Sequence, residues 1–195
     1  MQKIGRKIYH MSGGLIMVAA YAALGRTSGL AFLGGLFLVA TAIDVARLKT
    51  PAFNEFMYAH FSRFIRESEK DRLTGTPWYV LGVLLAAALY DLPVAAYAVA
   101  FLACGDVAAT TVGERWGTIK ISGVKSLQGT LAFIVVASLV GFLISRVFYP
   151  VSPAVFLVGA LVAAMVEILP LKLDDNLTVP VVSGAVMQAM IASGF

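Results

Sequence analysis

The chain has 195 residues, of which 59% are hydrophobic and only 13% are charged, and its formal net charge is +4. An ordinary soluble domain carries about 25% charged residues, so this composition excludes that class and indicates a membrane protein. Excess positive charge can indicate nucleic-acid binding in a soluble protein. Here membrane topology and attraction to anionic headgroups account for it, and we expect no nucleic-acid partner.

Apolar stretches of membrane-spanning character recur along the whole chain. They predict an all-α, polytopic membrane protein with about seven transmembrane helices. The predicted spans are 11–25, 29–46, 78–90, 93–112, 127–146, 153–169 and 177–193. The connections between them are short, so we expect one membrane-embedded domain over residues 1–195. Nothing in the sequence excludes an oligomer.

The basic residues divide unevenly between the two sides of this threading. Of the 15 Lys and Arg residues, only Arg26 and Arg146 fall on one side. The others are Lys3, Arg6, Lys7, Arg47, Lys49, Arg63, Arg66, Lys70, Arg72, Arg115, Lys120, Lys125 and Lys172. The positive-inside rule makes the crowded side cytoplasmic, with the N-terminus inside and the C-terminus outside. The long polar connections also lie on this side, so we expect the functional site there.

Arg6, Lys7 and His10 stand at the start of the first predicted span. Basic residues in this position usually set topology, and a histidine one turn further is an ordinary interfacial residue. Alone, this segment does not predict a site.

The connection 47–77 contains an amphipathic helix, which we expect over about 51–71. Its apolar face carries Phe53, Phe56, Met57, His60, Phe61, Phe64 and Ile65 at helical spacing. An aromatic face opposite basic residues suits a helix in the headgroup region. The helix is either an interfacial anchor or a wall through which a lipid enters, in which case Phe56, Phe61 and Phe64 bind lipid.

Asp106 lies within the fourth predicted span, roughly 9 Å inside the cytoplasmic end. An unpaired carboxylate at this depth costs about 2–3 kcal/mol, so it is either paired with a cation or functional. Thr110 and Gly113 follow at i+4 and i+7, which puts all three residues on one helix face. The pattern predicts a polar stripe from Asp106 to the cytoplasm. We favour a functional carboxylate.

The segment 113–130 is rich in glycines, hydroxyls and lysines and runs directly into the fifth predicted span. Glycines let backbone amides approach an anion, lysines add charge, and a helix N-terminus attracts phosphate. The residues concerned are Gly113, Lys120, Gly123, Lys125, Ser126, Gly129 and Thr130. The spacing is not that of a Walker A loop. The segment is either a nucleotide-binding loop or a basic loop that binds lipid headgroups.

Acidic residues gather before the last predicted span. Asp174, Asp175 and Asn176 follow Glu167 at a distance of seven to nine residues. One Asp or Asn would suffice to cap the helix. The additional carboxylates are hard oxygen ligands of the kind that Mg²⁺ binds. Asp44, near another cytoplasmic helix end, is equally consistent with a structural or a functional role.

These segments together resemble the CTP-dependent lipid-alcohol kinases, namely dolichol kinase, phytol kinase and the CTP-using diacylglycerol kinase, which are relatives of the phosphatidate cytidylyltransferases. The matching stretches are Arg6-Lys7-x-x-His10-x-x-x-Gly14, Leu73-Thr74-Gly75-x-x-Trp78 with Leu81-Gly82, Cys104-Gly105-Asp106-x-Ala108 through Gly113, Lys125-Ser126-Leu127-x-Gly129-Thr130, Glu167-x-Leu169-Pro170 and Asp174-Asp175-Asn176-Leu177-Thr178-Val179-Pro180. They cover nearly the whole chain. That family usually has Glu where Gln128 stands, which puts the metal preference in question.

The resemblance implies transfer of the γ-phosphoryl group of CTP to the hydroxyl of a membrane lipid alcohol, with Mg²⁺ as cofactor. It implies catalytic roles for Asp106, Asp174, Asp175 and His10, and metal ligation by Asp106, Glu167 and Asp175. The implied nucleotide-binding residues are Arg6, Lys7, Gly113, Lys120, Gly123, Lys125, Ser126, Gly129, Thr130 and Asn176. The short chain resembles a minimal prokaryotic version, so we expect it in a prokaryotic plasma membrane. The sequence carries no code for the alcohol, which is of the polyprenol, dolichol, phytol or geranylgeraniol type or diacylglycerol.

Three other functions compete with this one. A cytidylyltransferase would also use CTP but would attack its α-phosphorus and make a CDP-lipid. A small transporter would use Asp106 as a proton or ion site, but the predicted outer half of the chain carries almost no charge. A membrane scaffold would leave Asp106 and the run 174–176 without a role.

Overall fold

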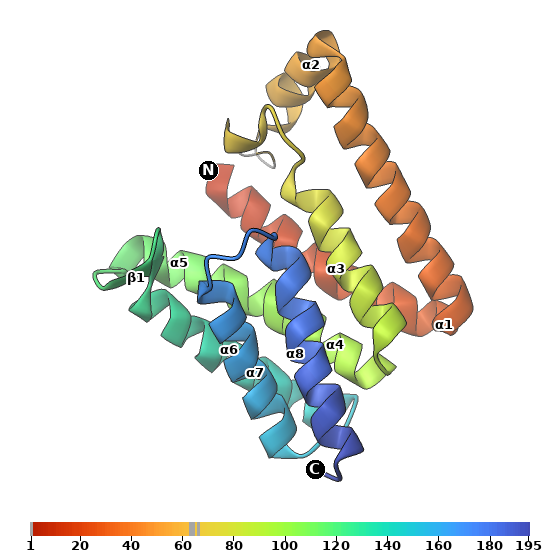
Figure 1. The fold of residues 1–195 in the computed structure, drawn as a ribbon, viewed down its shortest axis with the longest axis vertical. Helices are drawn as coiled ribbons and strands as arrows, with labels where there is room; N and C mark the ends of the chain where they lie inside the picture. The colour runs from red at the N-terminus through yellow and green to blue at the C-terminus, as the bar shows by residue number, and fades with distance from the viewer. Residues whose placement is uncertain (1, 63–64, 66) are drawn as a thin grey trace.

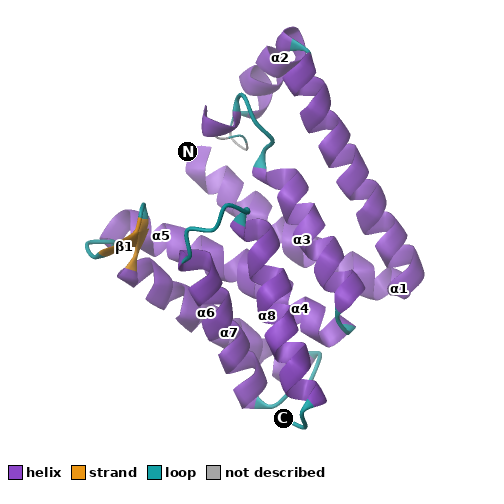
Figure 2. Ribbon diagram, viewed as in Figure 1, coloured by secondary structure: helices purple, strands orange, loops and turns teal. Residues whose placement is uncertain are grey.

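Almost the whole chain folds into helices, as Figure 2 shows for the computed structural model, which describes residues 2–62, 65 and 67–195. The helices are α1 (Gln2–Lys49), α2 (Pro51–Phe61), the 3-10 turn η1 (Glu67–Glu69), α3 (Gly75–Leu89), α4 (Leu92–Ala100), the π turn η2 (Phe101–Gly105), α5 (Asp106–Trp116), α6 (Leu127–Val147), α7 (Pro153–Ile168) and α8 (Asp175–Ala192). The predicted all-α class is confirmed, apart from one very short β-hairpin among the described residues.

Helix α1 bends sharply at Gly25, where φ is 74° and ψ is 170°. Only glycine adopts a positive φ without strain, so the bend falls where the sequence predicts a turn between two spans. The predicted spans 11–25 and 29–46 are the two arms of this helix. Figure 1 shows the first arm running beneath α3 and the second rising along one side of the molecule to α2.

One continuous helix, Leu92–Trp116, is built from α4, η2 and α5. Its most apolar stretch is 67% buried, against 17% for α1. The π turn stands immediately before Asp106. Such turns add a residue to one helical turn and recur at functional sites, because they change which side chains face the interior. In the central helix, Asp106 therefore follows directly after a segment that is buried in the apolar core.

Three of the described helices are long and apolar enough to cross a membrane: Ile4–Lys49, Leu92–Trp116 and Leu127–Val147. Gly75–Leu89 and Pro153–Ile168 are shorter apolar helices. The protein therefore has the character of a membrane protein, while the count of seven crossings stays a prediction. The three polar connections and the N-terminus lie at one end of the helices, and the short connections and the C-terminus lie at the other (Figure 1).

Helix α2 is shorter than the sequence predicts. It ends at Phe61, whereas the amphipathic pattern predicts a helix to about residue 71. The buried Arg47 side chain donates hydrogen bonds to the carbonyl oxygens of Glu69, Lys70 and Arg72. The Lys70 carbonyl oxygen also accepts from the Asn54 side chain at 3.1 Å, whereas a continuous helix would put these two residues roughly 24 Å apart. A tertiary contact therefore overrides the local pattern.

The segment between α5 and α6 forms a hairpin of β1 (Lys120–Ser122) and β2 (Lys125–Ser126). The strands are antiparallel, and Gly123 in the turn between them has a φ of 54°. Helix α6 begins directly after β2, at Leu127. The predicted loop thus leads into a helix N-terminus as expected, but it is braced by a hairpin that the sequence did not predict.

Candidate active site

Three carboxylates from three helices meet at the polar end of the molecule. Asp106 begins α5, Glu167 lies at the end of α7, and Asp175 begins α8. One oxygen of each lies within 4.8 Å of one oxygen of the others. Close α3–α8 packing helps to place Asp175, because any side chain at Gly82 would collide with the Asn176 carbonyl oxygen. Three hard oxygen donors at this spacing fit a divalent cation such as Mg²⁺.

Lys125 approaches the same cluster from β2. Its ammonium nitrogen lies 3.0 Å from Glu167 Oε1 and 3.2 Å from Asp175 Oδ2, and it also donates to the Glu167 carbonyl oxygen. Burial lowers the pKa of Lys125, but the neighbouring Asp175 and Glu167 carboxylates outweigh it and raise the pKa above its ordinary value. Lys125 is therefore positively charged at neutral pH and offsets part of the negative charge of the cluster.

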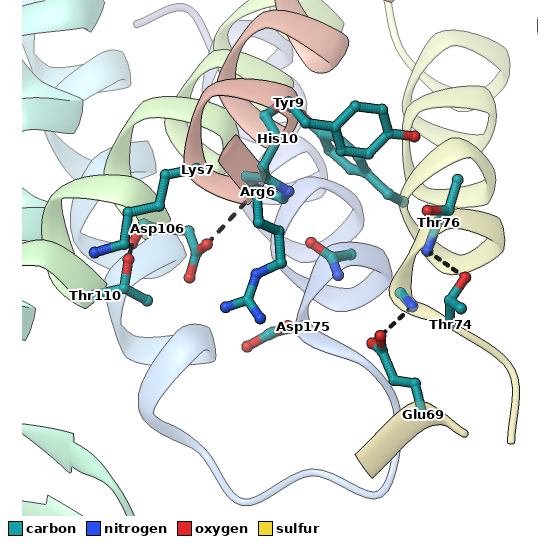
Figure 3. A pocket seen from close by; sticks show the side chains of 13 residues that line it. Arg6, Lys7, Tyr9, His10, Glu69, Thr74, Thr76, Asp106, Thr110 and Asp175 are labelled. Atoms are coloured by element: carbon teal, nitrogen blue, oxygen red, sulfur yellow. Dashed lines mark hydrogen bonds and ion pairs between the residues drawn. The ribbon is translucent and has the colours of Figure 1, made fainter. Parts of the chain in front are cut away.

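His10 is held against Asp106 by the start of α3. Its Nε2 atom lies 3.8 Å from Asp106 Oδ2. The His10 ring stacks on Tyr79, with ring centroids 4.3 Å apart, and the Tyr79 hydroxyl donates to the His10 carbonyl oxygen at 2.7 Å. Figure 3 shows the imidazole directed at the Asp106 carboxylate. The contact brings together two predicted catalytic residues that are far apart in the sequence.

Two adjoining cavities meet at this point. The larger has a volume of about 560 Å³ and the smaller, drawn in Figure 3, about 60 Å³. Both are lined by Arg6, Asp106, Thr110 and Asp175. The prediction that Asp106, Thr110 and Gly113 share one helix face is confirmed, because all three line the larger cavity. The four shared residues form a junction between the two cavities.

Most of the predicted nucleotide-binding residues line the larger cavity. These are Arg6, Gly113, Lys120, Lys125, Ser126, Gly129 and Thr130. Lys7 and Asn176 instead line the smaller one, and Lys7 also bonds to Thr111 Oγ1 at 3.2 Å and Glu114 Oε2 at 3.0 Å. Gly123 lies in the hairpin turn and lines neither cavity. Their binding roles stay predictions.

Asp174 is the N-cap of α8. Its Oδ1 atom accepts hydrogen bonds from the backbone N–H of Asn176 at 3.0 Å and from the Asn176 side chain at 2.7 Å. Asp174 lines neither of the two cavities, whereas Asp175 lines both. The capping role that the sequence offered as an alternative is therefore the one that the geometry supports, and a catalytic role for Asp174 stays an untested prediction.

Gln128, the position where the resemblance breaks down, braces the hairpin. Its side-chain nitrogen donates to Thr118 Oγ1 at 2.6 Å, and its side-chain oxygen accepts from the Ile119 backbone N–H at 3.3 Å. It lines neither cavity. An amide can make both bonds, whereas an ionised Glu could only accept.

The predicted lipid-binding phenylalanines lie elsewhere. Phe56 is 50% exposed and Phe61 is 43% exposed, both on α2, which Figure 1 shows away from α5, α6, α7 and α8. Phe64 lies outside the described residues. Lipid binding by this face stays a prediction.

Several residues that line the smaller cavity were not predicted as site residues from the sequence. Glu69, Thr74, Thr76 and Tyr79 line it together with Tyr9 and Gly75. Thr74 and Gly75 stood in one of the matching stretches, which was a usable signal. Glu69 is one acid in a charged run, and nothing in its neighbourhood marked it.

Comparison with known proteins identifies the family. No family model and no solved structure matches the chain. The chain is 32% identical over 219 residues to CTP-dependent diacylglycerol kinase 1 of Eremothecium gossypii, covering 97% of this chain and 68% of the relative. It is 32% identical over 169 residues to CTP-dependent diacylglycerol kinase 1 of Schizosaccharomyces pombe, covering 80% and 78%. It is 27% identical to phytol kinase 1, chloroplastic, of Arabidopsis thaliana, covering 100% and 68%. The chain therefore belongs to the family of lipid-alcohol kinases that contains the CTP-dependent diacylglycerol kinases and the phytol kinases.

Proposed function

We propose that this protein is a CTP-dependent lipid kinase, which transfers the γ-phosphoryl group of CTP to the hydroxyl of a membrane lipid alcohol at the cytoplasmic face. The observation that carries the proposal is the cluster of Asp106, Glu167 and Asp175, with Lys125 beside it, at the junction of two cavities. Membership of the kinase family supports the same reaction.

The larger cavity is the donor site in this proposal. Its volume of about 560 Å³ lies within the 300–1,000 Å³ typical of small-molecule sites. Arg6, Lys120 and Lys125 give it positive charge for phosphates, and it includes the N-terminal turn of α6, where the helix dipole favours an anion. These features suit a nucleoside triphosphate. The choice of CTP over other nucleotides rests on the family.

A divalent cation completes the donor site. Asp106, Glu167 and Asp175 would hold it. Bound there, the cation supplies neutralisation of the charge that develops on the β- and γ-phosphates. The side chains of Arg6 and Lys125 add further positive charge on the same side.

The transfer step requires one bond to form and one to break. The hydroxyl oxygen of the lipid attacks the γ-phosphorus, the bond from that phosphorus to the β–γ bridging oxygen breaks, and CDP leaves. The hydroxyl proton passes to His10, whose imidazole lines the smaller cavity and faces Asp106. Phosphoryl transfer depends mainly on positioning and charge neutralisation, so we expect the base to contribute less than the carboxylates.

The acceptor is a membrane lipid in this proposal. The cavities lie at the polar end of apolar helices, so a lipid tail can stay in hydrocarbon while its hydroxyl reaches Asp106. The relatives are named for diacylglycerol and for phytol, and both alcohols are candidates here together with longer isoprenoid alcohols.

The test is transfer of label from CTP to lipid by the purified protein in vesicles. Each vesicle preparation contains one alcohol: diacylglycerol, phytol, geranylgeraniol or a polyprenol. We expect label from the γ-phosphate, and none from the α-phosphate, to enter the lipid with at least one alcohol, and chelation of divalent cations to stop it. Entry of α-label would make the protein a cytidylyltransferase, and no transfer to any alcohol would contradict the proposal.

A further inference from the structure

The smaller cavity differs from the larger one in size and construction. Its volume of about 60 Å³ is small beside the 300–1,000 Å³ that is typical of small-molecule sites. It admits a hydroxyl and the carbon that bears it, but not a nucleotide. Its wall opposite Asp106 is the start of α3, at Thr74, Gly75 and Thr76 (Figure 3).

That wall is fixed by hydrogen bonds along its backbone. Glu69 is only 7% exposed, and its Oε1 atom accepts from the Gly75 backbone N–H at 3.1 Å. Thr74 caps α3 by accepting from the Thr76 N–H at 3.3 Å. The first N–H groups of a helix have no partner within the helix, so these two bonds determine how the start of α3 is presented.

Behind the wall stands a buried ion pair from the second arm of α1. Asp44 is 4% exposed and Arg47 is 0% exposed, and Arg47 Nε lies 2.7 Å from Asp44 Oδ1. Asp44 Oδ2 accepts from the backbone N–H of Thr74 at 2.6 Å and from its hydroxyl at 2.9 Å. Arg47 meanwhile holds the carbonyls of the segment that carries Glu69. One pair therefore fixes both Thr74 and Glu69.

A buried ion pair is a poor source of net stability, because desolvation costs about as much as the attraction returns. Removing one partner is nevertheless costly, since the other charge is left buried. The Asp44–Arg47 pair lines neither cavity, yet it orients Thr74 and Glu69, which line the smaller one. Its role is therefore to set the geometry of the wall.

We propose that the smaller cavity is the acceptor site, which receives the hydroxyl end of the lipid, and that Glu69 and the Asp44–Arg47 pair are the positioning residues that fix its wall. This inference rests on the proposed kinase function. Tyr9 lines the same cavity and is 42% exposed, so an amphipathic aromatic ring stands at the edge of the cavity. The lipid hydroxyl and the nucleotide thus reach Asp106 from opposite sides of the junction.

The first test replaces Glu69. Glu69→Ala removes the acceptor of the Gly75 N–H and is expected to raise the lipid mole fraction that gives half-maximal rate by about 10-fold, the effect of one lost charge-assisted bond. Glu69→Gln keeps an acceptor oxygen and should restore the wild-type value. Glu67→Ala is the matched control, because Glu67 is an exposed acid in the same 3-10 turn that lines neither cavity. Equilibrium binding of CTP is measured on every variant.

The second test replaces the ion pair. Arg47→Lys keeps the charge but loses the planar fork, and it should raise the same lipid parameter without changing CTP affinity. If this variant does not accumulate in the membrane, Thr74→Val and Thr74→Ser replace it. The Val variant, which loses both bonds of the hydroxyl, should raise the lipid parameter, and the Ser variant should not.

The results separate the two proposals. No γ-label in lipid with the wild-type protein would contradict the kinase function itself. If the wild-type protein is active, two results would overturn the acceptor site alone. One is a loss of CTP affinity in Glu69→Ala, and the other is an unchanged lipid mole fraction for half-maximal rate in that variant. Failure of Glu69→Gln to restore the wild-type value would overturn the positioning role.

Discussion

The two cavities that meet at Asp106 use charge in different ways. In the larger cavity, charged side chains such as Lys125 and Asp175 face the space that a ligand would fill. Behind the smaller cavity, Asp44 and Arg47 face only protein and hold a wall of backbone and hydroxyl groups. The charged side chains of the larger cavity therefore act on the reacting groups, whereas the buried Asp44–Arg47 pair acts through the geometry of the wall. Substitutions on the two sides should separate accordingly.

The largest effect is expected at the carboxylate cluster. Asp106→Asn and Asp175→Asn are nearly isosteric and remove one negative charge each, so both should lower kcat by about 100-fold or more. Asp174→Asn is the matched control, because Asn caps a helix as well as Asp does and should keep most activity. Label-transfer assays on folded, membrane-inserted protein measure all three. Equal losses in the three variants would contradict the distinction between the cap and the cluster.

A smaller effect is expected at His10. His10→Gln removes the proposed proton acceptor but keeps a hydrogen-bonding side chain, so kcat should fall by about 10- to 100-fold, toward the low end of base catalysis. Raising the pH should recover part of the loss, because hydroxide can then take the proton of the bound alcohol in place of His10. A pH–rate profile of the variant parallel to that of the wild type would show that His10 only orients Asp106.

Lys125 should affect nucleotide binding more than turnover. Lys125→Ala removes a phosphate contact made before the transition state, so the KM for CTP should rise by about 10-fold. Lys172→Ala, an exposed lysine outside both cavities, is the control. An unchanged KM for CTP in Lys125→Ala would contradict the assignment.

The smallest effect is expected at α2. Phe56→Ser and Phe61→Ser change exposed side chains far from the junction. The lipid mole fraction that gives half-maximal rate should therefore change by about 2-fold at most for long-chain alcohols. A short soluble alcohol should be unaffected. If both classes of acceptor lose activity equally and strongly, α2 braces the site and is more than an interfacial element.

The sequence was informative where chemistry and helical periodicity coincide. Asp106, Thr110 and Gly113 were predicted to share a face because they lie within one regular helix, α5. The smaller cavity was missed because it depends on contacts between the second arm of α1 and the start of α3, which have no period in the sequence. The end of α2 was misplaced for the same reason, since Arg47 and Asn54 hold the Lys70 carbonyl beside the end of α1 and the chain turns back there.

The central claim is that γ-phosphoryl transfer passes directly from a nucleotide in the larger cavity to a hydroxyl presented from the smaller one. Stereochemistry at phosphorus tests it: CTP made chiral at the γ-phosphorus by isotopes of oxygen is the donor, and the configuration of the lipid phosphate is determined. A single in-line displacement across the junction predicts inversion. Retention would require a second displacement through a phosphorylated side chain, such as His10 or Asp106, and would contradict direct transfer.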